Sequence, residues 1–324
     1  MNVVVLNWNA WETTERCLES IRILNYTNYE ITIVDNGSQI KAPFCFKQKY
    51  LNCGIHQLEE NLGYTGGNNA GIKSALSRHA DLVLILNNDA VIEDPDMLNK
   101  LVACFLAFPQ VGIVGPRLRE YSPKGVLIGD GYAISRSLQL LISVARRRFF
   151  GTPLRENDFH QETVEEIGCK TDAISVPLVS GSVMLISKRV FDQIGFLDEQ
   201  LFMYDDETDF CLRASEAGFK IMYVQNTSVV RVTCIAEEMP AYRAYLQGRN
   251  RFLLARKRKT WLQSATFAFI HLLSSLRITV ILLKHKRWKE VTSMASGLRD
   301  GVVGHWGITP KLRGLLASGV TTSF

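Results

Sequence analysis

Leu82-Val83-Leu84-Ile85-Leu86 is an unbroken apolar run that is followed at once by Asn87-Asn88-Asp89. A strand without polar residues is buried on both faces, which is typical of a parallel sheet covered by helices. Open α/β sheets bind their ligands at the carboxyl ends of such strands. A carboxylate there is a hard oxygen ligand for Mg²⁺ or Mn²⁺, and the alternative is a simple turn into the next helix. The stretch predicts an α/β fold with a polar site at the carboxyl end of this strand.

Short apolar runs alternate with helical patterns on both sides of this strand. Strands are predicted at 3–6, 31–34, 111–114, 182–186 and 221–224, and helices at 13–24, 72–78, 94–108 and 188–194, with a later helix that ends at Gly218. Asp94 suits the N-cap of the helix 94–108, and Pro95 suits its first position. The order predicts one domain, residues 1–238, with a mainly parallel central sheet. Residues 117–171 are polar and irregular, and we expect them to form an insertion over the active site.

Composition and charge limit the kind of protein. The 324 residues are 47% hydrophobic, which is enough for a buried core. Net charge is only +5, but the segment between Glu238 and Glu290 contains twelve basic residues and no acidic one. This asymmetry indicates an anionic partner at the C-terminal end, a lipid surface or a phosphorylated ligand, and no nucleic acid. The seven cysteines are scattered, and the N-terminus lacks a basic signal region, so we expect a cytosolic chain without disulfides or a zinc site.

Residues 239–324 are predicted to form a basic and apolar helical region. The run 261–283 is long enough to cross a bilayer, but it contains polar residues that a spanning helix avoids. On a helical projection, the apolar residues of this run share one side. The polar residues share the opposite side: Ser264, His271, Ser274, Ser275 and Arg277. This pattern favours a helix lying on an anionic membrane, where each flanking cation contributes about 1 kcal/mol. The alternative is a helix that packs on the first domain.

Two polar segments precede the Leu82 strand. Asp35-Asn36-Gly37-Ser38 ends the second predicted strand, where Asp35 can accept a hydrogen bond from a nucleotide base or form an ordinary turn. The segment 61–71, Asn-Leu-Gly-Tyr-Thr-Gly-Gly-Asn-Asn-Ala-Gly, opens a helix. Glycine permits close backbone approach to a ligand, and amides at a helix end favour anions. The segment matches neither the dinucleotide fingerprint nor a Walker A loop.

An acidic segment, Tyr204-Asp205-Asp206-Glu207-Thr208-Asp209, begins a later helix that runs to Arg213 and beyond. Carboxylates this close repel one another, so one member can have a raised pKa and act as a general base. Metal binding is one alternative, and helix capping by Asp205 or Asp206 is another.

The order of these four motifs closely resembles the family 2 glycosyltransferases, particularly their rhamnosyltransferase-like bacterial branch. The resemblance covers residues 2 to 255, with a looser match at 297–301. Further segments carry it: Asn7-Trp8-Asn9, Ser180-Gly181-Ser182, Phe196-Leu197-Asp198-Glu199 and Tyr245-Leu246-Gln247-Gly248-Arg249-Asn250-Arg251. Each piece is weakly specific, and the combination is highly specific.

The resemblance implies a GT-A fold, a nucleotide-sugar donor and a divalent metal, Mg²⁺ or Mn²⁺. It assigns the nucleotide base to Asp35 and the metal to Asp89. The family's acidic pair aligns with Asp206 and Glu207, and the second member of that pair is normally the general base. Glu207 is therefore the first choice for the general base, and Asp206 is the alternative. The residues expected to contact the donor are Asp35, Asn61, Gly66, Gly67, Asn68, Asn88, Arg213, Arg231 and Arg249.

One position departs from the family pattern. Members commonly carry a His after the strand that follows the acidic helix, and Arg231 stands there in this chain. Arg cannot ligate a cation. Either the metal site lacks that ligand, or a fixed guanidinium takes over part of the charge of the leaving diphosphate.

The resemblance predicts an inverting glycosyltransferase that moves rhamnose or another hexose to a hydroxyl of a lipid-linked glycan in surface-polysaccharide synthesis, such as O-antigen assembly. We expect it on the cytoplasmic face of the cell membrane. The alternatives are a sugar nucleotidyltransferase and a catalytically inactive homologue that serves as a membrane-bound scaffold.

Overall fold

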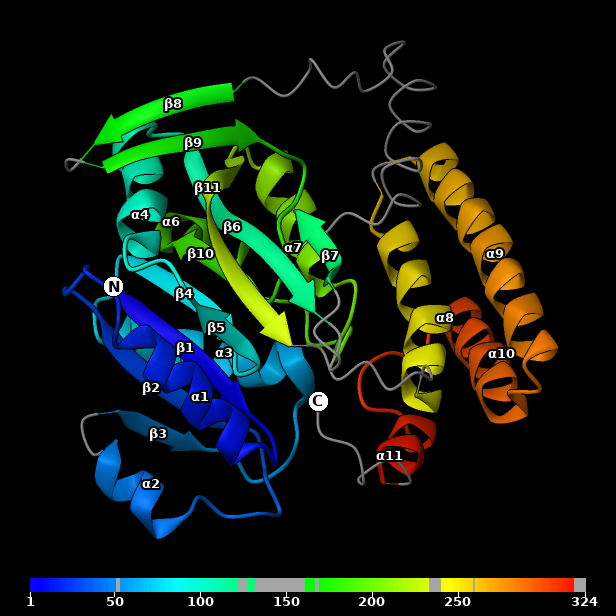
Figure 1. Cartoon of the computed structure of the whole chain (residues 1–324). Coiled ribbons are helices and arrows are strands. Elements are labelled where there is room, and N and C mark those ends of the chain that lie inside the picture. The colour runs from blue at the N-terminus through cyan, green and yellow to red at the C-terminus, as the bar shows by residue number, and fades with distance from the viewer. Residues whose placement is uncertain are drawn as a thin grey trace.

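The computed structural model describes residues 1–50, 53–121, 127–131, 161–166, 169–232, 240–258 and 260–317. Its centre is a mixed sheet of eleven strands (Figure 1). The strand order is β3-β2-β1-β4-β10-β6-β11-β9-β8, with β5 on β11 and β7 on β6.

The first part of the chain alternates strands and helices, as the sequence predicts. Its elements are β1 (Asn2–Asn7), α1 (Trp11–Ile21), β2 (Glu30–Asp35), α2 (Phe44–Lys49), β3 (Gly54–Gln57), α3 (Gly63–Ser77), β4 (Leu82–Asn87), β5 (Ala90–Ile92) and α4 (Met97–Ala107). Strands β3, β2, β1 and β4 pair in parallel. Their carboxyl ends therefore meet along one edge of the sheet.

The next part completes the sheet. It contains β6 (Val111–Tyr121), β7 (Leu127–Gly131), β8 (Gln161–Glu166), β9 (Cys169–Ser175), β10 (Val183–Ser187), α6 (Lys188–Ile194), α7 (Asp206–Glu216) and β11 (Lys220–Val232). Strand β10 is antiparallel to both of its neighbours, β4 and β6, and β11 is parallel to β6. The described parts of the predicted insertion 117–171 belong to strands of this sheet, and the rest of the insertion lies outside the described residues.

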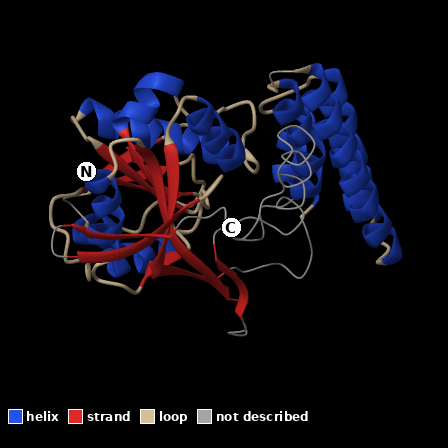
Figure 2. Cartoon of the chain, turned by 90° about the horizontal axis from the view of Figure 1, so that it is seen from above, coloured by secondary structure: helices blue, strands red, loops and turns tan. Residues whose placement is uncertain are grey.

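Helices cover both faces of the sheet, which explains the continuous apolar strands (Figure 2). Alternate residues of β1 enter different cores: Val3 and Val5 pack with α1 and α4, and Val4 packs with α3. Burying one such side chain contributes about 1.5–3 kcal/mol. Helix α3 begins at Gly63, before the predicted start at residue 72. Its glycines are poor helix formers, but they let the helix approach β1 and β2, and packing outweighs propensity.

Four helices follow: α8 (Ala241–Arg256), α9 (Trp261–Lys284), α10 (Trp288–Val303) and α11 (Pro310–Ala317). They stand beside the sheet and its covering helices (Figure 2). Gly297 permits the close contact of α8 and α10, because a Cβ there would lie 2.0 Å from the Tyr245 carbonyl oxygen. Tyr245 Oη donates to Asp300 Oδ2 (2.6 Å) and bonds Thr309 Oγ1 (2.8 Å), which joins α8 to α10 and to the turn before α11.

Candidate active site

The ends of β1, β2 and β4 place amide and carboxylate side chains together. Asp35 is 3% exposed, and its Oδ1 accepts from the backbone N–H of Ser38 (3.2 Å) and from Asn7 Nδ2 (3.5 Å). Thr14 Oγ1 donates to Asn7 Oδ1 (2.8 Å) and accepts from Asn88 Nδ2 (3.0 Å). The strand ends are therefore tied into one network, with Asp35 and Asn88 as predicted members.

Asn36 connects this edge to the start of α3. Its Nδ2 donates to Asn61 Oδ1 and to the Gly63 carbonyl, each at 3.0 Å, and its Oδ1 accepts from the Leu62 N–H (3.0 Å). Asn61 Oδ1 also accepts from the Gly63 N–H (2.8 Å). Asn36 thus fixes the turn that precedes α3, a role that sequence reasoning missed.

The glycines of α3 serve packing within the protein. A Cβ on Gly67 would lie 2.5 Å from Leu6 Cδ1, and one on Gly66 would lie 2.6 Å from Leu62 Cβ. Asn68 is buried, with Nδ2 donating to the Tyr64 carbonyl (2.9 Å). The absence of a side chain at Gly66 and Gly67 is thus explained by helix packing, and their predicted contact with the donor remains a prediction.

Asp89 and Arg231 form an ion pair at the end of β4. Arg231 Nε donates to Asp89 Oδ2 (2.6 Å), and Nη1 donates to Glu120 Oε1 (3.3 Å) and Ser182 Oγ (3.4 Å). Burial alone would lower the pKa of Arg231, but the charges of Asp89 and Glu120 outweigh it and raise this pKa. Arg231 therefore stays cationic beside Asp89.

The other carboxylate oxygen of Asp89, Oδ1, is buried and has no hydrogen-bond partner among the described residues. A buried charged oxygen without a partner is costly, so this atom fits a cation or a ligand donor that completes it. One carboxylate together with substrate phosphates is a common way to hold Mg²⁺. Among the described residues, no group of three or more His, Cys, Asp and Glu side chains is arranged to hold a metal. Asp89 therefore fits a cation held mainly by the donor.

The acidic pair begins α7. Asp206 is 3% exposed, and burial together with the charge of Glu207 raises its pKa well above the usual range. Glu207 is half-buried, and burial and the charge of Asp205 raise its pKa to about 7. A general base works best when its pKa lies near the operating pH. The electrostatics favour Glu207 over Asp206 as the base.

Residues 181 and 182 lie between the Asp89–Arg231 ion pair and the carboxylate of Glu207. Ser182 Oγ accepts from Arg231, as described above, and Gly181 lies against Glu207. A Cβ on Gly181 would be 3.3 Å from Glu207 Cβ and 3.4 Å from Tyr64 Oη, and Tyr64 donates to the Gly181 carbonyl. The segment thus brings the Asp89–Arg231 pair and Glu207 to one site.

The loop before α7 has unusual backbone geometry. Phe202, Tyr204 and Asp205 have φ angles of 66°, 68° and 61°. Each such angle in a residue other than glycine costs about 1–3 kcal/mol and persists only where surrounding contacts impose it. Asn250 of α8 supplies those contacts, because its Nδ2 lies 2.8–3.1 Å from the carbonyl oxygens of Leu201, Met203 and Tyr204. Helix α8 therefore positions the loop that presents the acidic pair.

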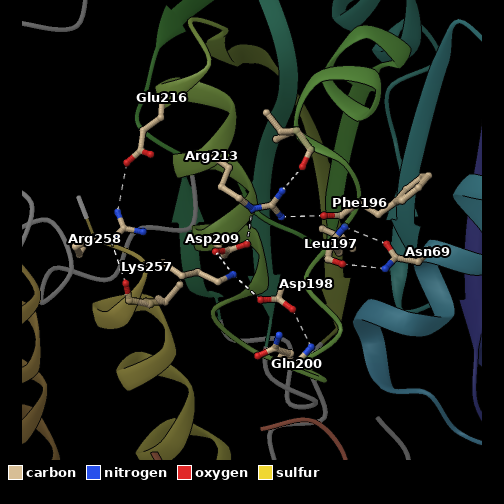
Figure 3. Close-up of polar contacts among 12 residues, drawn as sticks. Asn69, Phe196, Leu197, Asp198, Gln200, Asp209, Arg213, Glu216, Lys257 and Arg258 are labelled. Atoms are coloured by element: carbon tan, nitrogen blue, oxygen red, sulfur yellow. Dashed lines mark hydrogen bonds and ion pairs between the residues drawn. The ribbon is translucent and has the colours of Figure 1, made fainter. Parts of the chain in front are cut away.

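Arg249 also holds this loop, and its predicted contact with the donor remains a prediction. It is completely buried and donates to the carbonyl oxygens of Gln200, Leu201 and Gly307. Arg213 is likewise engaged by protein groups: it donates to Asp209 Oδ2 and to the carbonyls of Ile194 and Phe196, each at 2.8 Å (Figure 3). With these donors occupied, both arginines support the fold around α7.

Lys257, at the end of α8, completes the same support. It bridges Asp198 and Asp209 below Arg213 (Figure 3). The sequence does not reveal these partners, because they lie 59 and 48 positions away. Tyr64, Gly181 and Asn250 were missed as site residues for the same reason, although all three lie in segments that carry the family resemblance.

Comparison with known proteins agrees with this geometry. The family model described as "Glycosyltransferase like family 2" matches residues 1–253. The low-salt glycan biosynthesis hexosyltransferase Agl10 of Haloferax volcanii is 28% identical over 78% of this chain and 74% of its own length. The N-acetylglucosaminyl-diphospho-decaprenol L-rhamnosyltransferase of Mycobacterium tuberculosis is 27% identical over 70% and 74%, respectively.

A solved structure supports the same fold. The mannosyltransferase from Pyrobaculum calidifontis, in complex with GDP-Man and Mn²⁺, aligns with a TM-score of 0.52 at 16% identity, covering 98% of this chain and 79% of that one. The predicted GT-A fold is confirmed. The chain belongs to the family 2 glycosyltransferases and is a nucleotide-sugar-dependent enzyme of glycan synthesis.

Proposed function

We propose that this enzyme is an inverting transferase that moves rhamnose or another hexose from a nucleoside-diphosphate sugar to a hydroxyl of a lipid-linked glycan. The observation that carries the proposal is the placement of Glu207 and the Asp89–Arg231 pair on either side of residues 181 and 182. A base and a charged group for the leaving diphosphate are the two elements that a single displacement requires.

In the proposed step, Glu207 accepts the proton of the acceptor hydroxyl as that oxygen forms a bond to the anomeric carbon. The bond from this carbon to the phosphate oxygen breaks, and the electron pair leaves with the nucleoside diphosphate. Attack from the opposite face inverts the anomeric configuration. Positioned proton transfer contributes about 10²- to 10⁴-fold to the rate.

The leaving diphosphate needs positive charge. Arg231 supplies a fixed guanidinium, whose planar group suits phosphate oxygens. Asp89 would hold a divalent cation through its free Oδ1, and such an ion would neutralise part of the diphosphate charge. Asp35 is the proposed partner of the nucleotide base.

Helix α9 supports the proposed membrane attachment. Part of its polar side faces α8, since His271 is 3% exposed and bonds the Gly248 carbonyl (2.9 Å), and Ser275 is also buried, whereas Arg277 is exposed. Its apolar side is exposed: Trp261, Leu262, Phe269, Leu272, Leu273, Leu276, Val280, Ile281 and Leu283. An outward apolar face beside basic flanks suits the cytoplasmic surface of an anionic bilayer. The 24-residue helix is also the one described helix long and apolar enough to span a membrane.

A donor screen tests the proposed function. The enzyme is incubated with nucleoside-diphosphate sugars and lipid-linked acceptors, and the product is examined for the anomeric configuration by NMR. The proposal predicts release of nucleoside diphosphate and an inverted glycosidic bond. A parallel incubation supplies a nucleoside triphosphate and a sugar 1-phosphate, and release of pyrophosphate there would indicate a nucleotidyltransferase. Donor binding without turnover would indicate an inactive scaffold.

A further inference from the structure

Helix α8 presents a polar stripe beside the loop that precedes α7. Arg243, Gln247 and Arg251 follow one another at intervals of four residues and are half-buried, whereas residues 244–246 and 248–250 between them are buried. Residues spaced by four lie on one side of a helix. The stripe therefore forms a single surface along the side of α8.

Several polar atoms on and beside this stripe lack hydrogen-bond partners in the part of the chain that the structure describes. They are Arg243 Nε, Gln247 Oε1 and Asp205 Oδ2, and all three are buried. The guanidinium of Arg243 lies over the Tyr204 ring, 5.4 Å from its centroid. Buried polar atoms are normally satisfied, so atoms of this kind in one place indicate a ligand that completes them. The unpaired set includes both a donor and acceptors.

The stripe adjoins the proposed base. Arg251 Nε lies 3.5 Å from Asp205 Oδ1, and Asp205 and Tyr204 directly precede the acidic pair of α7. Arg251 also contacts α9, because its Nη1 donates to Ser274 Oγ (3.1 Å). A molecule on the stripe would thus lie beside the loop that precedes the base, and at Arg251 it would also lie beside α9.

We propose that Arg243, Gln247 and Arg251 form a subsite for a diphosphate that joins the acceptor sugar to its lipid. This inference rests on the proposed function. The two guanidinium groups match phosphate oxygens in geometry and charge. Gln247 Oε1 and Asp205 Oδ2 can accept hydrogen bonds from sugar hydroxyls. The subsite selects acceptors whose reactive sugar is attached directly to the diphosphate, because the base is adjacent.

Acceptor kinetics test the subsite. Two acceptors carry the same sugar and the same alkyl chain, one through a diphosphate and one through a plain glycosidic bond. Loss of one charge-assisted contact costs about 1.5–3 kcal/mol, so Arg243→Gln and Arg251→Gln should each raise KM for the diphosphate acceptor by at least about 10-fold. KM for the glycoside and for the donor should change less than about 2-fold, within the scatter of a surface substitution. Arg256→Gln is the control, since this exposed cation on the same helix contacts the Val302 carbonyl.

Equal KM changes for both acceptors, or a changed donor KM, would overturn the subsite. Normal acceptor KM with weaker sedimentation on anionic liposomes would overturn it as well, in favour of a membrane-lipid contact. A second measurement does not depend on turnover: calorimetric titration with inorganic pyrophosphate, in the presence of saturating nucleoside diphosphate. Weaker binding by Arg243→Gln than by Arg256→Gln supports the subsite even if no acceptor is glycosylated, and equal binding rejects it.

Discussion

Arg231 Nε and Asp89 Oδ2 are 2.6 Å apart, so the strand-end carboxylate is already paired with a fixed cation. Asp89 is only 11% exposed, and its second oxygen is free of protein partners. The pair gives the site one positive group for the diphosphate and one unfilled carboxylate oxygen. Both features bear on how the leaving group is neutralised.

The first prediction concerns Asp89. Asp89→Asn should abolish transfer, because it removes the negative charge that fixes Arg231 and the oxygen available to a cation. The amide can still accept from Arg231, so the fold should remain. Turnover and circular dichroism of the purified variant check this, with Glu93→Gln as the control, since Glu93 is an exposed carboxylate paired with Arg119. Undiminished turnover, with or without Mn²⁺, would remove Asp89 from the mechanism.

The second prediction is a pH dependence. Glu207 must be ionised to accept a proton, so kcat/KM should fall as the pH drops through its pKa of about 7 and should reach a plateau above it. Asp205 contributes to the raised pKa, so Asp205→Asn should move this acidic limb to lower pH. Asn tolerates the left-handed backbone of this position well. The kcat/KM pH profiles of the wild type and of Asp205→Asn are compared. If the acidic limb lies at the same pH in both, Asp205 does not influence the pKa of Glu207.

The third prediction concerns the loop held by Asn250. Asn250→Ala removes the side-chain donor shared by the carbonyls of Leu201, Met203 and Tyr204, of which Leu201 keeps its bond from Arg249. This loss should lower the free energy of unfolding by about 1–3 kcal/mol. At temperatures where the variant is folded, kcat should fall because the general base Glu207 is displaced. The KM for the donor should stay near normal, because the ends of β1, β2 and β4 are not displaced. Denaturant unfolding and steady-state kinetics measure both effects. An unchanged kcat would show that the loop geometry does not depend on Asn250.

The fourth prediction concerns the apolar face of α9. Phe269, Leu272 and Leu276 are 47–62% exposed, so replacing all three with Ser should weaken sedimentation with anionic liposomes without unfolding the protein. Leu106→Ser is the control, since this residue is 58% exposed on α4. Point substitutions are preferable to a truncation after residue 258, which would also remove Asp300 and Gly307 from the α8 network. Unaltered liposome binding would reject the membrane role of this face.

Much of the fold can be predicted because local patterns specify it. The apolar run 82–86 is a central strand, and the acidic segment begins a helix, as the sequence indicates. The same patterns place Asp35 at the end of a strand and Asn88 and Asp89 directly after one. These features depend on periodicity and on residues close in sequence.

The sequence does not predict contacts between side chains and partners that lie far away along the chain. Arg213 and Arg249 are predicted to contact the donor, and the sequence does not reveal that both arginines donate to backbone carbonyls of this chain. The sequence pattern favours a membrane-bound α9, and it does not reveal that His271 on this helix bonds the Gly248 carbonyl of α8. Neither outcome follows from local sequence, because burial is decided by tertiary packing.

The stability of amide variants provides a control for the central claim. Burial raises the pKa values of Asp206 and Glu207 above those of an unfolded chain, so ionisation of either group opposes folding. The stability that these groups contribute when protonated is lost as the pH rises through their folded pKa values. Amides at these positions should therefore leave the enzyme at least as stable as the wild type above neutral pH.

Single-turnover transfer by Glu207→Gln and Asp206→Asn, measured above neutral pH with saturating donor, tests the account most directly. Loss of the base should lower the rate of Glu207→Gln by about 10²-fold or more, with donor binding little changed. Asp206→Asn should be milder, because this carboxyl is buried and its pKa is raised well above the usual range. A large defect in Asp206→Asn together with near-normal chemistry in Glu207→Gln would contradict the assignment and make Asp206 the base.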